Sequence, residues 1–141
     1  MNYPENVKDM INDFQFLTDW EDRYMHVIDM GKLLPSLNAT EKTDTNKVKG
    51  CVSQVWLISN MSDGPDPIIS FRGDSDAYIV KGLVAITLEI FSNRKASEIL
   101  SLNAIEVLRE LELDEHLSLQ RANGLKAMIA KIKDYAQNAL N

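Results

Sequence analysis

The middle of the chain carries two strand-like runs joined by a turn, and this pattern constrains the fold more than any other. The runs are VSQVWLI at residues 52–58 and DPIISF at 66–71, both rich in β-branched and aromatic residues. Between them lies SDGPD, which has the composition of a turn centred near Gly64. The sequence therefore predicts an antiparallel β-hairpin, whose returning residues 72–76 lie beside Cys51.

Helical periodicity flanks this hairpin on both sides. Thr18 to Glu21 has the form of a capping box, Pro35 stops a helix, and Ser118 is an expected helix cap. The expected fold class is α+β, with two N-terminal helices, a small curved antiparallel β-sheet and a helical C-terminal half. Apolar residues at helical spacing predict helices over residues 6–17, 20–34, 74–91, 96–100, 103–111 and 119–140.

Length and charge narrow the class of protein. The 141 residues fit one domain spanning residues 1–141. A chain of this size buries about 68–70% of its unfolded surface, so it needs no disulfide or metal ion to fold. The formal charge of −6 argues against a nucleic-acid partner. No apolar stretch approaches the ~20 residues that cross a membrane. The single cysteine and the absence of a secretory signal favour a free thiol in the cytoplasm.

The residues alone leave the role of Cys51 open. A free cysteine is commonly a small buried core residue. Cys51, however, follows the polar stretch 36–49 and comes directly after Gly50, which gives the backbone extra conformational range. If the thiol is reactive, nearby positive charge favours the thiolate, and the lysines of that stretch and Arg72 are candidate sources.

Other residues that could bind a metal or take part in catalysis are better explained by structural roles. The segment GDSD at 73–76 lacks the further oxygen ligands of a calcium site, so Asp74 or Ser75 is expected to cap the following helix. Nothing in the sequence places His26 or His116 next to Cys51. The sequence also lacks phosphate-loop, zinc and hydrolase motifs. We therefore expect neither a metal site nor a Cys-His hydrolase.

Four segments share their order and spacing with a known family. They are KVKGCVSQVWLI at 47–58, GDSDAYIVKGLVAI at 73–86, DRYMHVIDMGKLLP at 22–35 and EHLSLQRANGLKAMIAKIK at 115–133. The first contains a Gly-Cys-x-Ser-x-Val-Trp run, and together the four resemble the SufE family of sulfur-acceptor proteins over nearly the whole chain. The resemblance implies one SufE-like domain, with a fold similar to U-type iron–sulfur scaffolds and the cysteine on a loop.

The resemblance also implies a function. Cys51 would take a sulfur atom from the persulfide of a pyridoxal-phosphate-dependent cysteine desulfurase, SufS, and stimulate its turnover. The sulfur would then pass to a SufBCD scaffold for iron–sulfur cluster assembly. The chain itself is expected to need no cofactor and to be an accessory protein rather than a stand-alone enzyme, since one cysteine cannot hold a cluster. A homodimer is compatible with the sequence.

The expected site centres on Cys51 as the reactive residue, with Gly50 as the hinge of a loop that swings out when a partner docks. Three alternatives stay open: a CsdE-type paralogue that serves another desulfurase, a thiol enzyme such as a peroxidase, and a structural adaptor with an incidental cysteine. The residues expected to shape the thiol's surroundings or to dock the partner are Gly50, Ser53, Gln54, Asp74, Ser75, Asp76 and Arg121.

Overall fold

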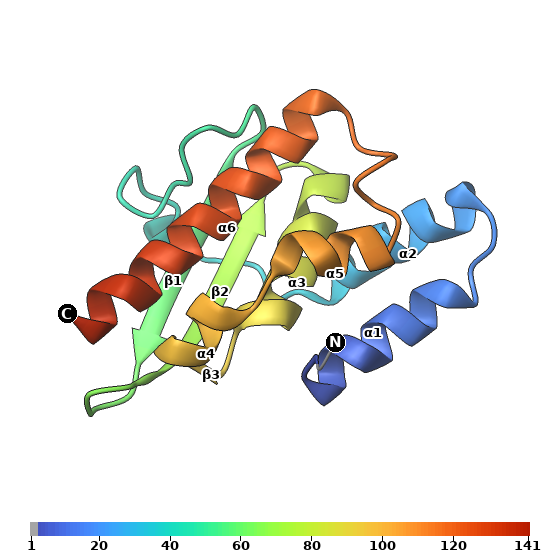
Figure 1. Ribbon diagram of the computed structural model, residues 1–141. Helices are drawn as coiled ribbons and strands as arrows, with labels where there is room; N and C mark the ends of the chain where they lie inside the picture. Colours follow the sequence, from blue (N-terminus) through green and yellow to red (C-terminus); the bar gives the residue numbers. More distant parts are fainter. Residues whose placement is uncertain (1–2) are drawn as a thin grey trace.

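The computed structural model describes residues 3–141 and has the α+β architecture that the sequence predicts (Figure 1). Two helices come first, a β-hairpin follows, and most of the remaining chain is helical. In chain order the elements are α1 (Glu5–Gln15), α2 (Trp20–Leu33), the 3-10 helix η1 (Ala39–Glu41), β1 (Val55–Met61), β2 (Ile68–Ser75), α3 (Tyr78–Phe91), β3 (Arg94–Lys95), α4 (Ala96–Ser101), α5 (Ala104–Glu110) and α6 (Leu119–Leu140).

The helices lie close to their predicted bounds, but the cap predicted for the second helix is wrong. Helix α2 ends at Leu33, shortly before Pro35 as expected, yet its N-cap is Asp19 and no side chain caps it. The capping box predicted from Thr18 therefore does not form, because the helix begins one residue too late for it. The N-cap of α6 is Ser118, as predicted, and its side chain accepts a hydrogen bond from the Arg121 backbone N–H.

The β-hairpin is confirmed, with both strands shifted toward the C-terminus. The strands are antiparallel, and the register pairs Val55 with Ser75 and Met61 with Ile69. The first strand does not begin at Val52, which is 76% exposed, but at Val55, which is fully buried. A third short strand, β3, pairs with the start of β2 and was not predicted, because two residues carry no alternation.

The longer second strand changes the expected start of α3. Strand β2 runs to Ser75, so Asp74 and Ser75 belong to the sheet and Ala77 is the N-cap of the helix. The prediction that Asp74 or Ser75 caps α3 is therefore wrong. Helix α3 is the most apolar helix, and eleven of its fourteen residues are buried.

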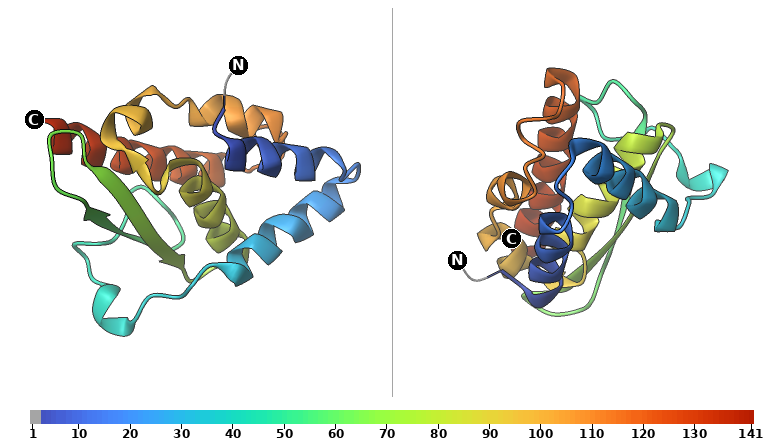
Figure 2. Two further views of the ribbon diagram at one scale, coloured as in Figure 1. Left: turned by 90° about the horizontal axis from the view of Figure 1, so that it is seen from below. Right: turned by 90° about the vertical axis from the view of Figure 1, so that its right-hand side faces the viewer.

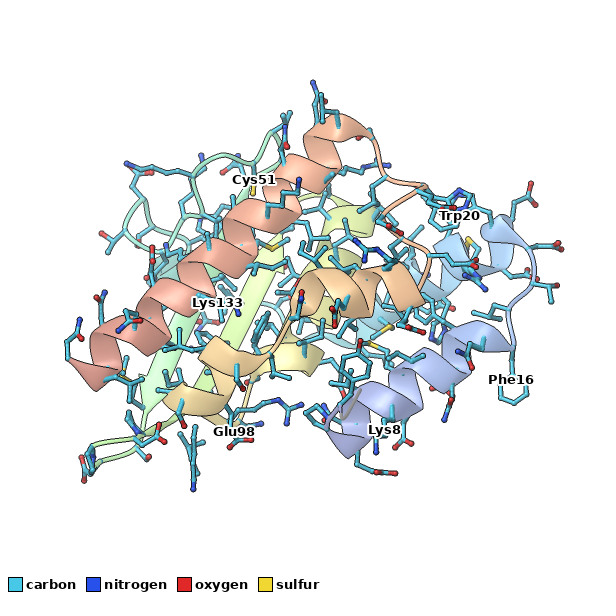
Figure 3. All side chains as sticks on the ribbon, viewed as in Figure 1. Lys8, Phe16, Trp20, Cys51, Glu98 and Lys133 are labelled. Carbon is cyan, nitrogen blue, oxygen red and sulfur yellow. The ribbon has the colours of Figure 1, made fainter. Side chains whose placement is uncertain are left out.

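The sheet lies between helices and a long loop. Helices α3 and α6 pack on one face, where Phe71 contacts Tyr135 of α6 and a Cβ at Gly73 would meet Val84 of α3. The loop that contains η1 lies on the other side of the sheet, as Figure 2 shows. One cluster of buried apolar side chains draws on all six α-helices, β1 and β2. Cys51 lies just before β1, at the end of the sheet where α6 begins (Figure 3).

Candidate functional site

Residues 49–54, called here the Cys51 loop, project from a closed stem. The Val48 backbone N–H donates to the Val55 carbonyl at 2.8 Å, and the Leu57 N–H donates to the Asn46 carbonyl at 2.8 Å. Residues 46–48 thus pair with the start of β1 in the manner of an additional strand. These backbone hydrogen bonds hold the two ends of the six-residue loop together.

The Cys51 loop turns at Gly50. Its backbone has a φ of 94°, in the region that residues with a Cβ rarely adopt. A Cβ at this position would also lie 3.3 Å from the Cβ of Ala127 on α6. The glycine next to the cysteine is therefore required both by the backbone conformation and by the close approach of the helix.

The thiol of Cys51 is half-buried against α6. Its Sγ–H donates to the Gly124 carbonyl at 3.4 Å. The sulfur faces a pocket of about 350 Å³, which combines apolar side chains from α3 and α6 with polar groups at the start of α6. Figure 3 shows Cys51 beside the N-terminal half of α6. The pocket is lined by Cys51, Val52, Ser53, Val80, Leu83, Ser118, Gln120, Arg121, Gly124, Leu125 and Met128.

Burial dominates the electrostatics of this thiol. Removal from water disfavours the charged form, and it raises the pKa of Cys51 above the ordinary value for a cysteine. Arg72, expected as a source of positive charge, pairs with Ile58 of β1 and forms an ion pair with Glu41 instead. In this conformation the sulfur is thus a protonated, weakly nucleophilic thiol at neutral pH.

Five predicted site residues lie around the base and mouth of the loop. Ser53 and Arg121 line the pocket. The Gln54 backbone N–H donates to the Asp76 carboxylate at 3.0 Å, and the Ser75 hydroxyl donates to the Gln54 carbonyl at 2.8 Å. The predicted return of the hairpin toward the cysteine is therefore correct for its last residues only, which hold the end of the loop rather than the sulfur.

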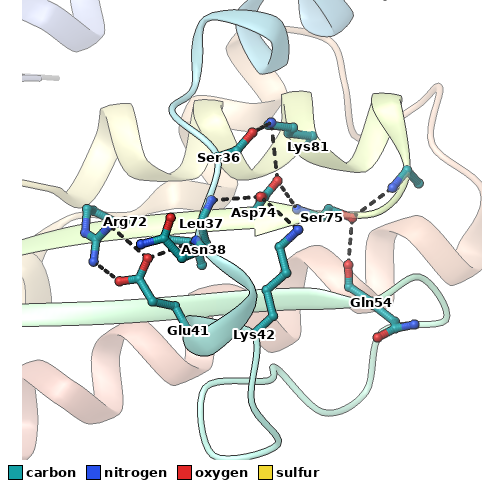
Figure 4. A network of polar contacts seen from close by, with 11 residues as sticks. Ser36, Leu37, Asn38, Glu41, Lys42, Gln54, Arg72, Asp74, Ser75 and Lys81 are labelled. Atoms are coloured by element: carbon teal, nitrogen blue, oxygen red, sulfur yellow. Dashed lines mark hydrogen bonds and ion pairs between the residues drawn. The ribbon is translucent and has the colours of Figure 1, made fainter.

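Asp74 is buried away from the pocket. Its carboxylate accepts the backbone N–H groups of Leu37 at 3.0 Å and Ser75 at 2.8 Å. It also forms ion pairs with Lys42 at 3.5 Å and Lys81 at 3.3 Å (Figure 4). Burial by itself would raise the pKa of Asp74, but the two backbone hydrogen bonds and Lys81 outweigh it and lower that pKa below the usual range. Asp74 thus fastens the loop containing η1 to the sheet.

Sequence reasoning missed Gly124, although it is the residue that the sulfur touches. A Cβ at Gly124 would lie 3.3 Å from the Cys51 sulfur. Gly124 falls inside the helix predicted over residues 119–140, where apolar periodicity marks only the residues that face the core. A helical stripe indicates which face is buried and does not identify the segment that lies against it.

The histidines lie apart from the thiol. His116 stacks on Trp20 with ring centroids 4.1 Å apart, and His26 packs edge-on against Phe14 at 4.9 Å. Neither lines the Cys51 pocket. Within residues 3–141, no three His, Cys, Asp or Glu side chains are grouped as a metal site would require. No helix in that part of the chain is sufficiently long and apolar to traverse a membrane.

Comparison with known proteins defines the class to which this fold and thiol belong. Residues 8–136 match the SufE family, described as an Fe-S metabolism associated domain. A SufE-like protein of Rhizobium meliloti is 50% identical over 136 residues, covering 96% of this chain and 97% of its own length. A SufE-like protein of Rhizobium etli is 51% identical over 133 residues, covering 94% of this chain and 90% of its own length.

The chain therefore belongs to the SufE family, as the four sequence segments predicted. Membership assigns it to sulfur transfer in iron–sulfur metabolism and implies a cysteine desulfurase as partner. A solved structure supports the fold independently. The solution structure of a hypothetical protein from Thermus thermophilus superposes with a TM-score of 0.77 at 17% identity, over 99% of this chain and 98% of that one.

Proposed function

We propose that Cys51 accepts a sulfur atom from the persulfide of a pyridoxal-phosphate-dependent, SufS-like cysteine desulfurase in the cytoplasm. By clearing the donor persulfide it stimulates the desulfurase, and it then passes the sulfur to a SufBCD-type scaffold. The observation that carries the proposal is the placement of the only thiol of the chain, at the tip of a closed loop and facing a pocket. The pyridoxal phosphate belongs to the partner, so the acceptor contributes only its thiol.

The transfer needs no oxidant or reductant. The Cys51 thiolate attacks the outer sulfur of the donor persulfide, and the bond between the two donor sulfurs breaks. The donor cysteine leaves as a thiolate and takes up the proton that Cys51 has lost. Cys51 then carries the persulfide, and the same exchange run toward an acceptor thiol on the scaffold returns it to a free thiol.

The half-buried position of Cys51 suits a carrier between its two partners. In the resting conformation, burial raises the pKa of the thiol and limits the access of small thiols that compete for a loaded sulfur. Transfer requires the sulfur to reach the donor, so the Cys51 loop swings outward when the desulfurase docks. Gly50 provides the turning point of that motion, while the hydrogen bonds of the stem hold residues 48 and 55 together.

The remaining site residues have two proposed roles. Ser53 and Arg121 line the pocket and contact the incoming partner. Gln54, Ser75 and Asp76 hold the C-terminal end of the loop through their mutual hydrogen bonds. Asp74 acts more remotely, by fixing the loop that contains η1 against the outer face of the sheet.

Intact mass measurement tests the acceptor function. The protein is incubated with a SufS-like desulfurase, pyridoxal phosphate and cysteine, and is weighed without reduction. We expect a mass gain of one or more sulfur atoms that a reducing agent removes, together with faster alanine release by the desulfurase. Cys51→Ser removes both effects, whereas Lys8→Met, at an exposed position of α1 outside the Cys51 pocket, retains them.

The three alternative hypotheses predict different results in the same assay. A gain with a different cysteine desulfurase alone, and none with a SufS-like one, identifies a CsdE-type paralogue. Unchanged stimulation by Cys51→Ser identifies an adaptor whose cysteine is incidental. Rapid turnover of peroxide at Cys51 without any sulfur gain identifies a thiol peroxidase, and it contradicts the proposal.

A further inference from the structure

One face of α6 contacts the N-terminal part of the Cys51 loop and the stem next to it. Gly124, Ala127 and Lys131 are three and four residues apart, so they share one side of the helix. Gly124 touches the sulfur, Ala127 lies under Gly50, and Lys131 reaches the stem at Lys47. These three residues are called here the loop-contact face of α6.

Gly124 makes the room that the sulfur occupies. The Cys51 Sγ would lie 3.3 Å from a Cβ on Gly124, closer than nearly all such contacts, and the Cα and Cβ of Cys51 would lie at 3.7 Å. The Gly124 carbonyl oxygen accepts a hydrogen bond from the Cys51 thiol. Glycine is otherwise unfavourable inside a helix, by about 1 kcal/mol relative to alanine. Its φ is not unusual here, so the absent side chain rather than the backbone conformation accounts for the glycine.

Lys131 contacts the stem on the N-terminal side of the loop. Its ammonium group donates to the Lys47 carbonyl at 3.1 Å and lies 6.0 Å from the ring centroid of Tyr135. Lys47 pairs with Trp56 in the stem. Burial, and then the neighbouring charge of Lys49, lower the pKa of Lys131. A lysine that is partly withdrawn from water to bind a single carbonyl fixes that carbonyl in place.

We propose that the loop-contact face of α6 holds the Cys51 loop in its withdrawn position, and that Gly124 is the positioning residue for the acceptor sulfur. The proposal deepens the proposed function and rests on it for its consequence in sulfur transfer. Loss of the contact at Gly124 or at Lys131 shifts the loop toward its exposed position. The exposed thiol is better solvated and ionises more readily, so it reacts faster with any electrophile.

Alkylation kinetics test this inference without a desulfurase. Cys51 is the only thiol, so the rate of iodoacetamide labelling, measured across pH by intact mass, reports its exposure and its pKa directly. We compare the unmodified protein with Gly124→Ala and Lys131→Met. The control is Lys126→Met, which removes the same charge from an exposed position of α6 that makes no side-chain hydrogen bond or ion pair among residues 3–141.

We expect Gly124→Ala to label at least about threefold faster at neutral pH, with the midpoint of its pH profile shifted down, since each pKa unit changes the thiolate fraction about tenfold. Lys131→Met should move both values in the same direction, and Lys126→Met should leave them unchanged. The proposal would be overturned if Gly124→Ala keeps the thermal unfolding temperature of the unmodified protein and also keeps its labelling rate and the midpoint of its pH profile. Equal acceleration by Lys126→Met would overturn it as well.

The result is separable from the fate of the proposed function. Faster labelling of Gly124→Ala, with no sulfur gained from any desulfurase, supports the contact and refutes the carrier. If the protein is a carrier, loaded Gly124→Ala should also lose its sulfur to added glutathione faster than the loaded unmodified protein. Equal loss from both loaded proteins, together with unchanged labelling, would contradict the positioning role while leaving the carrier intact.

Discussion

At the scale of single residues, Asp74 shows how a carboxylate near the site serves the fold. It is 2% exposed, and its two oxygens receive two backbone N–H groups and two lysines. Two of these partners, Leu37 and Lys42, lie in the long loop between α2 and β1. Asp74 therefore connects that loop to strand β2, and the connection is lost if the carboxylate is removed.

We expect Asp74→Ala to lower the free energy of unfolding by about 3 kcal/mol, because it leaves Lys81 and two backbone N–H groups without their buried acceptor. Urea unfolding followed by circular dichroism measures the change. Asp44→Ala is the control, because Asp44 is exposed and its carboxylate has no partner among residues 3–141. A loss below about 0.5 kcal/mol for Asp74→Ala, the size typical of surface changes, would refute the anchoring role.

The lowered pKa of Asp74 also predicts a pH dependence. A carboxyl group whose pKa is lower in the folded state contributes stability above its unfolded pKa, and this contribution is lost as the pH falls through the folded value. The difference in unfolding free energy between the unmodified protein and Asp74→Asn should therefore be largest at neutral pH and shrink in acid. A difference that stays constant down to the acid limit of the fold would contradict the shift.

At the scale of elements, the crossing of α2 and α3 depends on a pair of glycines. A Cβ on Gly82 would lie 2.1 Å from the Val27 carbonyl oxygen, and a Cβ on Gly31 would lie 2.6 Å from the Gly82 nitrogen. The two helix backbones thus touch directly. Because α3 also carries Leu83, which lines the Cys51 pocket, the crossing helps to place one wall of that pocket.

Gly82→Ala should lower the free energy of unfolding by about 2–3 kcal/mol, because the helices must separate and overpacking outweighs the gain in helix propensity. Gly124→Ala is the matched comparison, since it is also a helical glycine but its added Cβ meets a movable sulfur rather than a backbone atom. Thermal unfolding of both variants checks the contrast. Equal unfolding temperatures of the two variants would contradict the prediction, because they would show that α2 and α3 can accommodate the added Cβ without separating.

At the scale of the whole molecule, the buried apolar cluster predicts that the chain unfolds as one unit. All six α-helices and two strands contribute to that cluster, so among residues 3–141 no group of elements has a core of its own. The two tryptophans report on different regions. Trp20 stacks on His116 near the start of α2, and Trp56 lies in β1 under Lys42.

Trp20→Phe keeps Trp56 as its only fluorescent tryptophan, and Trp56→Phe keeps Trp20. We expect urea unfolding of each variant to give a single cooperative transition, both by fluorescence and by circular dichroism. In each variant the fluorescence and circular dichroism midpoints should coincide, because local and global unfolding are then the same event. A fluorescence transition that precedes the loss of helix in either variant would reveal two separately folding units and refute the prediction of one domain.

Much of the fold could be read from local patterns, and the errors have local causes as well. Helix α6 was predicted with the bounds that it has, because twenty-two residues of consistent periodicity leave little ambiguity. The first strand of the hairpin was predicted three residues early, since Val52 has the composition of a strand residue but projects into solvent at the loop. Met25 and Met61 are 51% and 47% exposed, and their composition gave no sign of this, because a methionine does not by itself indicate which side of an element faces inward.

The periodic helices, the hairpin and the single thiol within a SufE-like motif could be predicted from the sequence, because each is encoded by residues close together in the chain. The behaviour of that thiol depends on how distant parts of the chain pack. Its contact with Gly124 joins residues 73 positions apart, and the burial that raises its pKa comes from helices that the local pattern of residues 49–54 does not specify. Burial depends on distant segments packing together, so the reactivity of Cys51 is a property of the folded chain.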